Sequence, residues 1–469
     1  MRLTDLTLAE AAKKIETKKL SPVELTKACL ERVEKYDDTL KTFISVYADE
    51  AIEIAKANER LISSGNYLGP LHGIPMALKD NVAVANKVTT AGSKILKNEV
   101  SKEDAAVTKN LRSSGAIILG KLNMHEFAWG GTSENPHYGT VRNPWDHERF
   151  AAGSSGGSGA SVSAGMCLAS IGTDTGGSIR LPAAVNGLAG IRPTYGRVSN
   201  AGIIPLAWSM DTAGPMARTA EDCAIVFQHI AGHDSNDPNS ARVQVDDYLS
   251  NLRKPLKGIR IGVVPGYFFH HLQQAVHDAV KEALAVYQQL GAEIVEVDIK
   301  NIHGNISAQL TIESVEPSAY HQKWLREQPE NYGEDVRMLL EMGEMLLATH
   351  YVQAQRYRTL LRNEFMEAFD KVDVFICPTL PFAATKIGTT KVVIENGVEE
   401  DMLAAIMQFT GVPSLTGLPS LNVPCGFDDE GMPIGMQIIG KPFDEALLFN
   451  MGTVYQDNTD HHEQRPPLP

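Results

Sequence analysis

The feature that most constrains this chain is a glycine- and serine-rich stretch at residues 149–197. Residues 152–158 read Ala-Gly-Ser-Ser-Gly-Gly-Ser, and residues 172–180 read Gly-Thr-Asp-Thr-Gly-Gly-Ser-Ile-Arg. Between them, residues 166–171 are apolar and long enough for a buried strand. Glycines on both sides let backbone N–H groups approach a ligand without a Cβ in the way. The pattern therefore predicts two loops that hold an anion beside a core strand.

A flexible linker is the alternative interpretation of residues 153–165, which contain five glycines and five serines. Charged residues are absent from this segment, and the apolar strand follows directly. A linker on the surface would not be joined to a core strand, so we favour an ordered structure.

Length and element order bound the architecture. The chain has 469 residues, for which length alone would favour about three domains. Because no Pro-, Ser- or charge-rich linker divides it, we expect a single domain over residues 1–469, with a short helical segment at about 1–65 packed on it.

Helical and strand patterns alternate along most of the chain, which predicts an α/β fold. A capping box at residues 21–24 begins one of two expected N-terminal helices, and residues 300–370 are expected to be mostly helical, without a motif. The other expected helices are 104–114, one that starts at 219–222, and 272–290. The expected strands are 71–78, 116–119, 259–264, 292–297, 372–378, 421–425 and 433–440.

Charge and cysteine usage exclude several classes of partner. The formal net charge of −14 argues against a nucleic-acid or anionic-membrane partner, since both are negatively charged and bind basic patches. Five widely spaced cysteines without a Cys-x-x-Cys pair predict reduced thiols in the cytoplasm. No apolar run reaches the length of a membrane span, and no zinc-type Cys and His spacing is present.

Two further motifs are misleading. Residues 115–122 nearly match a phosphate-binding loop, but Leu122 replaces the hydroxyl residue and the segment is an apolar strand by pattern. Ser155 lies in a Gly-x-Ser-x-Gly pattern, but no strand precedes it, as a nucleophile elbow requires. Ser178 is better placed as a nucleophile because it follows a strand. The residues just before it are small, so that their backbone N–H groups are accessible to a ligand.

The serine motifs, together with Lys79 at the end of the 71–78 strand, resemble the amidase signature family. The resemblance extends to residues 73–75, 192–197, 417–419 and 433–437, and so covers most of the chain. It implies one large mixed, twisted β-sheet covered by helices on both faces. It also implies a small-molecule amide substrate, no cofactor, no metal and a monomer or homodimer.

The resemblance also implies roles for individual residues. Ser178 would form the acyl-enzyme, Ser154 would follow a cis peptide bond and relay the proton, and Lys79 would be the base. The implied oxyanion and substrate-binding residues are Thr175, Gly176, Gly177, Trp129, Gly130 and Gly131, with the Ser178 N–H. Ala152 stands where the family usually has glycine.

A catalytic Lys79 must be buried. At a pKa near 10.4, a lysine is neutral in roughly one molecule in 2,500 at pH 7, and burial lowers that pKa. The alternative is a surface Lys79 that pairs with Asp80. Asp174 and Arg180 are expected to form a structural, charge-assisted pair that holds the Ser178 loop.

Three functions are consistent with the sequence. We expect an amidase that resembles general bacterial amidases and places Phe127 and Trp129 in an apolar substrate pocket. The alternative is the glutaminase (A) subunit of the tRNA-dependent amidotransferase. Arg358 matches that subunit's carboxylate-binding arginine, but Met407 and Gln408 occupy the segment where its aspartate is expected. The third is a catalytically silent binding protein on the same scaffold.

Overall fold

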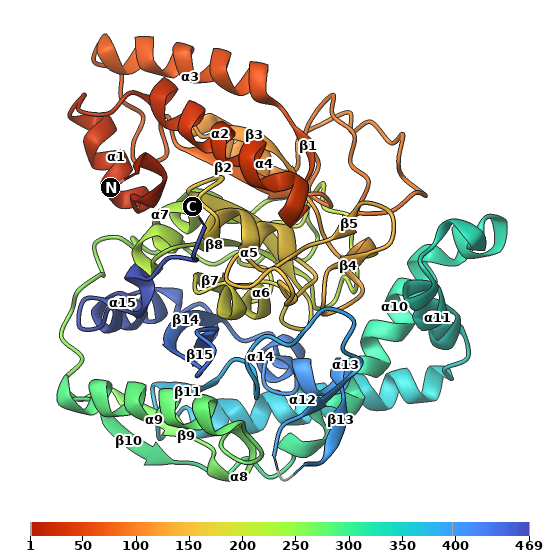
Figure 1. Ribbon diagram of the computed structural model, residues 1–469. Helices are drawn as coiled ribbons and strands as arrows, with labels where there is room; N and C mark the ends of the chain where they lie inside the picture. The colour runs from red at the N-terminus through yellow and green to blue at the C-terminus, as the bar shows by residue number, and fades with distance from the viewer. Residues whose placement is uncertain (1, 396, 469) are drawn as a thin grey trace.

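One sheet of eleven strands runs through the molecule in the order β1-β3-β2-β6-β8-β7-β14-β15-β11-β9-β10 (Figure 1). The structure is a computed structural model and describes residues 2–395 and 397–468. The strands of this sheet are β1 (Phe43–Val46), β2 (Pro75–Lys79), β3 (Ile117–Leu122), β6 (Ala169–Asp174), β7 (Ala189–Arg192), β8 (Thr212–Ala217), β9 (Arg260–Val263), β10 (Glu293–Glu296), β11 (Val374–Pro378), β14 (Ser420–Phe427) and β15 (Pro433–Gly440). Two small hairpins pair β4 (Glu134–Asn135) with β5 (Gly139–Thr140), and β12 (Lys391–Val393) with β13 (Glu399–Asp401).

Helices surround this sheet. The α-helices are α1 (Leu8–Glu16), α2 (Pro22–Leu40), α3 (Ala48–Ser63), α4 (Ala106–Ser113), α5 (Gly156–Ser163), α6 (Arg180–Val185), α7 (Ala220–Ile230), α8 (Pro265–Phe268), α9 (Gln274–Gln289), α10 (Asn305–Glu327), α11 (Glu334–Glu344), α12 (Ala348–Ala368), α13 (Met402–Met407), α14 (Gly411–Thr416) and α15 (Glu445–Gln456). Short 3₁₀ turns are η1 (Leu3–Asp5), η2 (Glu126–Ala128), η3 (Ile302–Gly304), η4 (Pro329–Asn331) and η5 (His461–Glu463).

Strand β14 separates helices that lie on opposite faces of the sheet. Leu421 and Val423 point toward Gly452 of α15, whereas Asn422 and Ala184 of α6 both lie against Gly435 of β15. Because successive side chains of a strand point to opposite faces, α15 and α6 cover the two sides of the sheet. The fold expected from the family resemblance, a large mixed sheet with helices, is confirmed.

The parallel pairing of β2 with β6 brings the two sequence motifs together. Ala77 of β2 pairs with Ser170 of β6, and both strands run in the same direction. Since parallel strands end at the same edge of a sheet, Lys79 at the end of β2 contacts Thr173 near the end of β6. The sheet therefore positions a lysine beside the strand that leads into the Gly-Gly-Ser loop.

The N-terminal segment differs from the expected two helices. It contains α1, α2 and α3, and β1 between the last two pairs antiparallel with β3. The short β1 segment Phe43–Val46 was missed because four residues give too little periodicity to predict a strand. This segment therefore supplies an edge strand of the main sheet as well as helices.

The glycine- and serine-rich stretch is neither a linker nor a simple pair of loops, because residues Gly156–Ser163 form the buried helix α5. Small residues allow this helix to pack closely: a Cβ on Gly157 would lie 2.4 Å from the Asn123 carbonyl oxygen. The following strand is Ala169–Asp174 instead of 166–171, because its polar end is paired with β8 and its Asp174 carboxylate is bound by buried arginines.

The close approach at Gly157 gives the first prediction. Gly157→Ala should lower the free energy of unfolding by about 1–3 kcal/mol, because its methyl group would overlap two backbone oxygens. Gly266→Ala is the matched control, since a Cβ there has no neighbour within 4 Å. Denaturant unfolding of both variants measures the difference. Equal stability of the two would contradict the packing argument.

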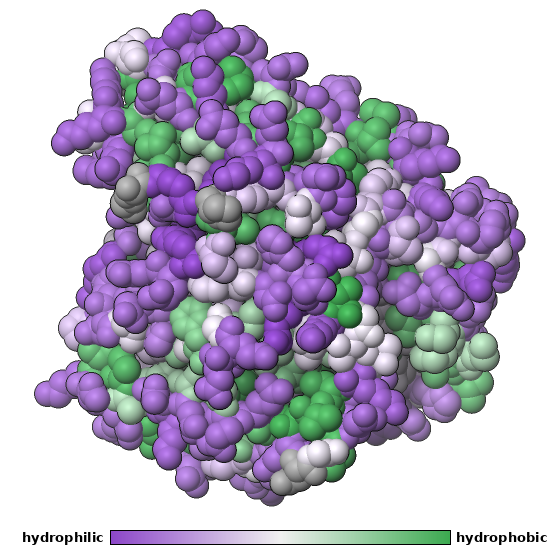
Figure 2. Space-filling model, viewed as in Figure 1, coloured by the Kyte–Doolittle hydropathy of each residue, from purple (hydrophilic) through white to green (hydrophobic). Residues whose placement is uncertain are grey.

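Helices α10, α11 and α12 occupy the 300–370 region that was expected to be helical, and α10 with α11 projects from the side of the molecule (Figure 1). Hydrophilic residues cover much of the face drawn in Figure 2, with separate apolar patches between them. Among the described residues, no helix combines the length and apolar character needed to cross a membrane. All five cysteines are buried and unpaired.

Candidate active site

Lys79 is completely buried at the end of β2. Its Nζ lies 2.7 Å from Ser154 Oγ and 2.8 Å from Thr173 Oγ1. The alternative of a surface pair with Asp80 is wrong, because the Asp80 carboxylate lies 2.8 Å from the Nζ of Lys121, and both side chains are buried. Lys121 in turn lies on strand β3, so the residues that imitate a phosphate-binding loop are part of the sheet.

Burial also sets the protonation of Lys79. Removal from water lowers its pKa to about 7, although the carboxylates of Asp211 and Asp174 oppose this effect. About half of the Lys79 side chains are then neutral at pH 7, compared with roughly one in 2,500 for an unperturbed lysine. A lysine in this state can accept a proton from the hydroxyl that it contacts.

The two neighbouring serines of the first motif face different partners. The peptide bond between Gly153 and Ser154 is cis, and the Ser154 hydroxyl contacts Lys79. The Ser155 hydroxyl instead donates to the Thr173 carbonyl at 3.1 Å and does not line the cavity beside Ser178. Ser155 therefore lacks the access that a nucleophile elbow would give it.

Ser178 lies between β6 and α6 and lines a narrow cavity. Of the predicted oxyanion and substrate-binding residues, Gly176, Trp129, Gly130 and Gly131 line the same cavity. Within the described residues, no protein acceptor takes a hydrogen bond from the N–H of Gly176, Gly177 or Ser178. Free N–H groups beside a serine hydroxyl are the arrangement needed to stabilise an oxyanion.

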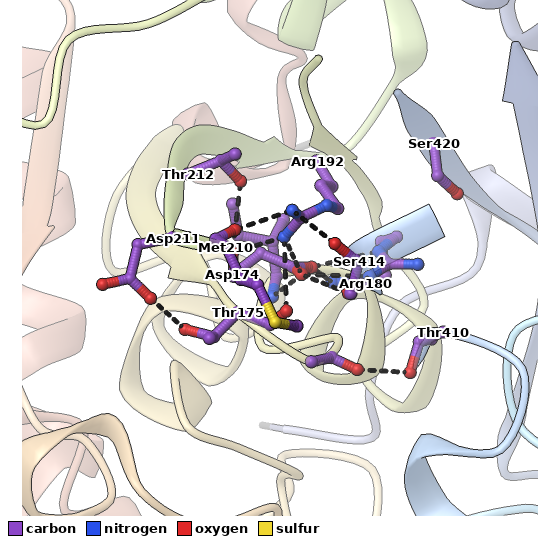
Figure 3. A network of polar contacts seen from close by, with 12 residues as sticks. Asp174, Thr175, Arg180, Arg192, Met210, Asp211, Thr212, Thr410, Ser414 and Ser420 are labelled. Carbon is purple, nitrogen blue, oxygen red and sulfur yellow. Dashed lines mark hydrogen bonds and ion pairs between the residues drawn. The ribbon is translucent and has the colours of Figure 1, made fainter. Parts of the chain in front are cut away.

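The loop at residues 175–179, called the nucleophile loop after the role expected for Ser178, is held by a buried ionic network (Figure 3). Arg180 and Arg192 each lie 3.0 Å from Asp174 Oδ1. Burial raises the pKa of the Asp174 carboxyl, but the charges of Arg180 and Arg192 outweigh it and hold this pKa well below its usual range. The expected Asp174 and Arg180 pair is present, and Arg192 adds a contact that the sequence prediction lacked.

Two hydroxyl contacts hold the loop on its other sides. Thr175 Oγ1 donates to Asp211 at 2.6 Å, and Thr410 Oγ1 donates to the Gly176 carbonyl at 2.7 Å (Figure 3). The side chain of Thr175 is therefore turned toward Asp211, and Thr175 does not line the cavity with Gly176. The family resemblance implies an oxyanion-hole role for the backbone N–H of Thr175, and that role does not involve its side chain.

A larger cavity of about 400 Å³ adjoins the narrow one, and the two share Trp129, Gly130, Gly131 and Leu403. A cavity of this size suits a small molecule. Phe127 lines neither of these cavities. Its ring packs instead against His321, Trp324 and Tyr332, because the chain turns away after Phe127 to form an aromatic cluster. The predicted apolar pocket thus keeps Trp129 but not Phe127.

Two polar residues that the sequence analysis missed lie on α10 beside the nucleophile loop. Glu313 lines the narrow cavity with Ser178 and is buried, and its Oε1 accepts a 3.1 Å hydrogen bond from Gln309 Nε2. Burial raises the pKa of Glu313 to about 8. Their spacing of four residues was the available signal, because it places two polar side chains on one face of a helix.

The residues considered for glutamine recognition are separated in the structure. Met407 lines the narrow cavity, and its Sδ lies 3.6 Å from Gln309 Nε2. The Gln408 carbonyl accepts a hydrogen bond from the Tyr267 hydroxyl. Arg358 donates to the Ser209 carbonyl at 2.8 Å and lines neither of the two cavities next to Ser178.

Comparisons with known proteins identify the family of the chain. The family model Amidase matches residues 24–449. A relative from Pseudomonas aeruginosa PAO1, named as the A subunit of glutamyl-tRNA(Gln) amidotransferase, is 40% identical over 99% of both chains. A solved structure described as "An unexpected vestigial protein complex reveals the evolutionary origins of an s-triazine catabolic enzyme" is 33% identical, with a TM-score of 0.93 over 97% of this chain and 98% of that one. A bacterial aryl acylamidase structure is 27% identical, with a TM-score of 0.89 over 98% of this chain and 99% of that one.

These relatives correct one expectation from the sequence. The expected closer likeness to general amidases is not supported, because curated relatives at 36–40% identity over nearly the whole chain are named as amidotransferase A subunits. The family of these relatives and solved structures consists of enzymes that act on amides. The chain therefore belongs to the amidase signature family of enzymes.

Proposed function

We propose that this enzyme hydrolyses a carboxylic amide through an acyl-enzyme on Ser178. The observation that carries the proposal is the buried Lys79, with a pKa lowered to about 7, in contact with Ser154 beside a cavity lined by Ser178. Such a lysine is the base that a serine nucleophile needs. The free N–H groups of the loop that contains Gly176 and Gly177 supply the oxyanion hole.

The proton balance of the reaction follows from these assignments. Ser178 Oγ attacks the amide carbon while its proton passes to Ser154, and the Ser154 proton passes to neutral Lys79. The tetrahedral intermediate then breaks its C–N bond, and the proton returns by the same route to the leaving nitrogen. Water attacks the Ser178 ester while its proton passes through Ser154 to Lys79. The bond between Ser178 Oγ and the acyl carbon then breaks, the proton returns through Ser154 to Ser178 Oγ, and the carboxylic acid product loses its proton to solvent and leaves as the carboxylate.

For the finer function, we propose that the chain is the ammonia-releasing glutaminase subunit of a tRNA-dependent amidotransferase. The support is the set of curated relatives that carry this name, which match at 36–40% identity over 98–100% of this chain. This function requires a partner that receives the ammonia. Glutamine would enter through the 400 Å³ cavity and place its side-chain amide at Ser178.

A stand-alone amidase for uncharged acyl groups is the second candidate. It is favoured by Met407, which is apolar and lines the narrow cavity, and by Arg358, whose guanidinium is directed to Ser209. Trp129 and Leu403 give the outer cavity apolar walls that suit an alkyl or aryl group.

The two candidates predict opposite substrate preferences. For the glutaminase, we expect kcat/KM for glutamine to exceed that for propionamide and benzamide by roughly tenfold or more, which is about 1.4 kcal/mol in the transition state. The measurement is ammonia release by the purified chain, alone and with the other subunits of a bacterial amidotransferase. Faster hydrolysis of the neutral amides, unchanged by these partners, would replace the glutaminase with the stand-alone amidase.

A further inference from the structure

We propose that Glu313, which accepts a hydrogen bond from Gln309, forms a subsite that binds an amino group on the acyl part of the substrate. The proposal rests on amide hydrolysis through Ser178 and applies whether the chain works alone or with a partner, but it excludes the candidate amidase that is selective for uncharged acyl groups. It names the kind of amide that the cavity selects, and it assigns this selection to helix α10.

The subsite contains one buried carboxyl oxygen that has no partner and belongs to a residue lining the cavity, Glu313 Oε2. Glu313 and Gln309 are each at most 1% exposed. Glu313 Oε2 and Gln309 Oε1 have no hydrogen-bond partner among the described residues. An unpaired buried acceptor destabilises a protein by about 1–3 kcal/mol, so a bound donor would stabilise this arrangement. Gln309 Oε1 faces Gly411 instead of the cavity. Glu313 Oε2 becomes a free acceptor when Glu313 ionises, and an ammonium group, which offers three donors and no acceptor, can then bind it.

The subsite directly adjoins the nucleophile loop. A Cβ on Gly176 would lie 2.4 Å from Gln309 Nε2 and 2.8 Å from Glu313 Oε1. The loop backbone and the two side chains are therefore in close contact, and only glycine fits between them. A substrate whose carbonyl oxygen is held by the loop N–H groups reaches Glu313 with a substituent on its acyl side.

The size of the inner cavity restricts the substituent. Its free volume is about 10 Å³, close to that needed for one water molecule. A primary ammonium is of this size, whereas an aromatic ring is not. Met407 lies next to Gln309, and its flexible thioether allows the cavity to widen around a short aliphatic chain.

The surrounding charges favour a cation over an anion. Burial raises the pKa of Glu313 and the hydrogen bond from Gln309 lowers it, while the carboxylates of Asp211 and Asp174 raise it further and the charge of Arg192 opposes them. Glu313 is consequently held largely as the neutral acid at pH 7 in the empty enzyme. When an ammonium binds, Glu313 loses its proton to solvent and forms an ion pair, whereas a carboxylate at this position would be repelled.

Four amides of matched length separate the effects of an ammonium group and of a carboxylate at the end of the acyl chain. Valeramide ends in a methyl group, γ-aminobutyramide has an ammonium there, glutaramate has a terminal carboxylate and glutamine has both charged groups. We expect kcat/KM for γ-aminobutyramide to exceed that for valeramide, and Glu313→Gln to lower the γ-aminobutyramide value by roughly 10- to 150-fold, the range for a hydrogen bond to a charged group. Valeramide hydrolysis should change less than about threefold.

Glu316→Gln is the matched control. Glu316 is buried on the same helix, but its carboxylate contacts the Tyr351 hydroxyl and the Ser209 N–H and lines neither cavity. The same charge removal there should leave the ratio of γ-aminobutyramide to valeramide unchanged. An equal change of this ratio in both variants would assign the effect to general loss of charge and overturn the subsite.

The pH profile gives an independent test. For γ-aminobutyramide, kcat/KM should rise through about pH 7 with Lys79 and again near pH 8, as Glu313 ionises. Valeramide should show only the first rise, and Glu313→Gln should remove the second rise for γ-aminobutyramide. Profiles that are the same for both amides would contradict the proposal.

Labelling with a fluorophosphonate separates failure of the subsite from failure of the proposed reaction, because the label needs only an active serine. Labelled Ser178 in both glutamate variants, with equal losses for γ-aminobutyramide and valeramide, would overturn the subsite alone. Absence of the label on Ser178 in the unmodified enzyme would instead overturn the reaction, and the subsite with it.

Discussion

Ser178→Ala is expected to abolish amide hydrolysis, with a loss of kcat on the order of 10⁶-fold, as in other serine hydrolases. The alanine variant retains Lys79 and Ser154 but has no oxygen to form an acyl-enzyme. The remaining rate would come from the loop N–H groups and substrate binding alone. Ammonia release in steady state measures the loss, and circular dichroism checks that the fold is retained.

Ser155→Ala is the matched control for Ser178→Ala. Its hydroxyl donates to the Thr173 carbonyl and lies outside the narrow cavity. We expect this variant to keep activity within about tenfold of the unmodified enzyme, because it loses only two buried hydrogen bonds, both with the Thr173 backbone. Activity that survives in Ser178→Ala but is lost in Ser155→Ala would restore the nucleophile-elbow interpretation.

Lys79→Ala should lower kcat/KM by roughly 10²- to 10⁴-fold, the usual contribution of a general base. This loss of activity should exceed the loss caused by the missing side-chain volume alone. Ser154 would keep its hydroxyl, but no group would accept its proton. Lys79→Met fills the same space without an amine and serves as the matched variant. Equal activity of Lys79→Met and the unmodified enzyme would remove Lys79 from the mechanism.

The pH dependence of the unmodified enzyme follows from the direction of the Lys79 shift. Burial lowers the pKa of Lys79 to about 7, and only the neutral amine acts as a base. For an uncharged amide, kcat/KM should therefore fall as the pH drops below about 7 and level off above it. Lys79→Ala should flatten this limb. A limb near pH 10 instead would indicate an unperturbed lysine.

Much of the site could be predicted from the sequence because its residues follow strands. Lys79 ends an apolar run, and Ser178 follows another, so a parallel sheet brings both to one edge. The ion pair of Asp174 with Arg180 was predictable from proximity in the sequence. Alternating helical and strand patterns predicted an α/β fold, and the family resemblance implied the large mixed sheet. The strands β1, β7 and β8 were not predicted.

Other parts could not be predicted because they depend on tertiary contacts. Helix α5 consists of glycine, serine and other small residues, most of which have poor helix propensity. Glycine is needed there because neighbouring backbone packs closely against the helix. Arg192 reaches Asp174 from a neighbouring part of the sheet, and Phe127 turns into an aromatic cluster. Glu313 lies 135 residues beyond Ser178, and no local pattern reveals that the α10 face carrying it covers the nucleophile loop.

The most direct test of the central claim is the site of covalent labelling. The purified enzyme is treated with a fluorophosphonate at pH 8, digested and mapped by mass spectrometry. Formation of the acyl-enzyme on Ser178 predicts a single adduct on the peptide that contains Ser178, and its loss in Ser178→Ala. An adduct on Ser154 or Ser155 with Ser178 unmodified would contradict the account.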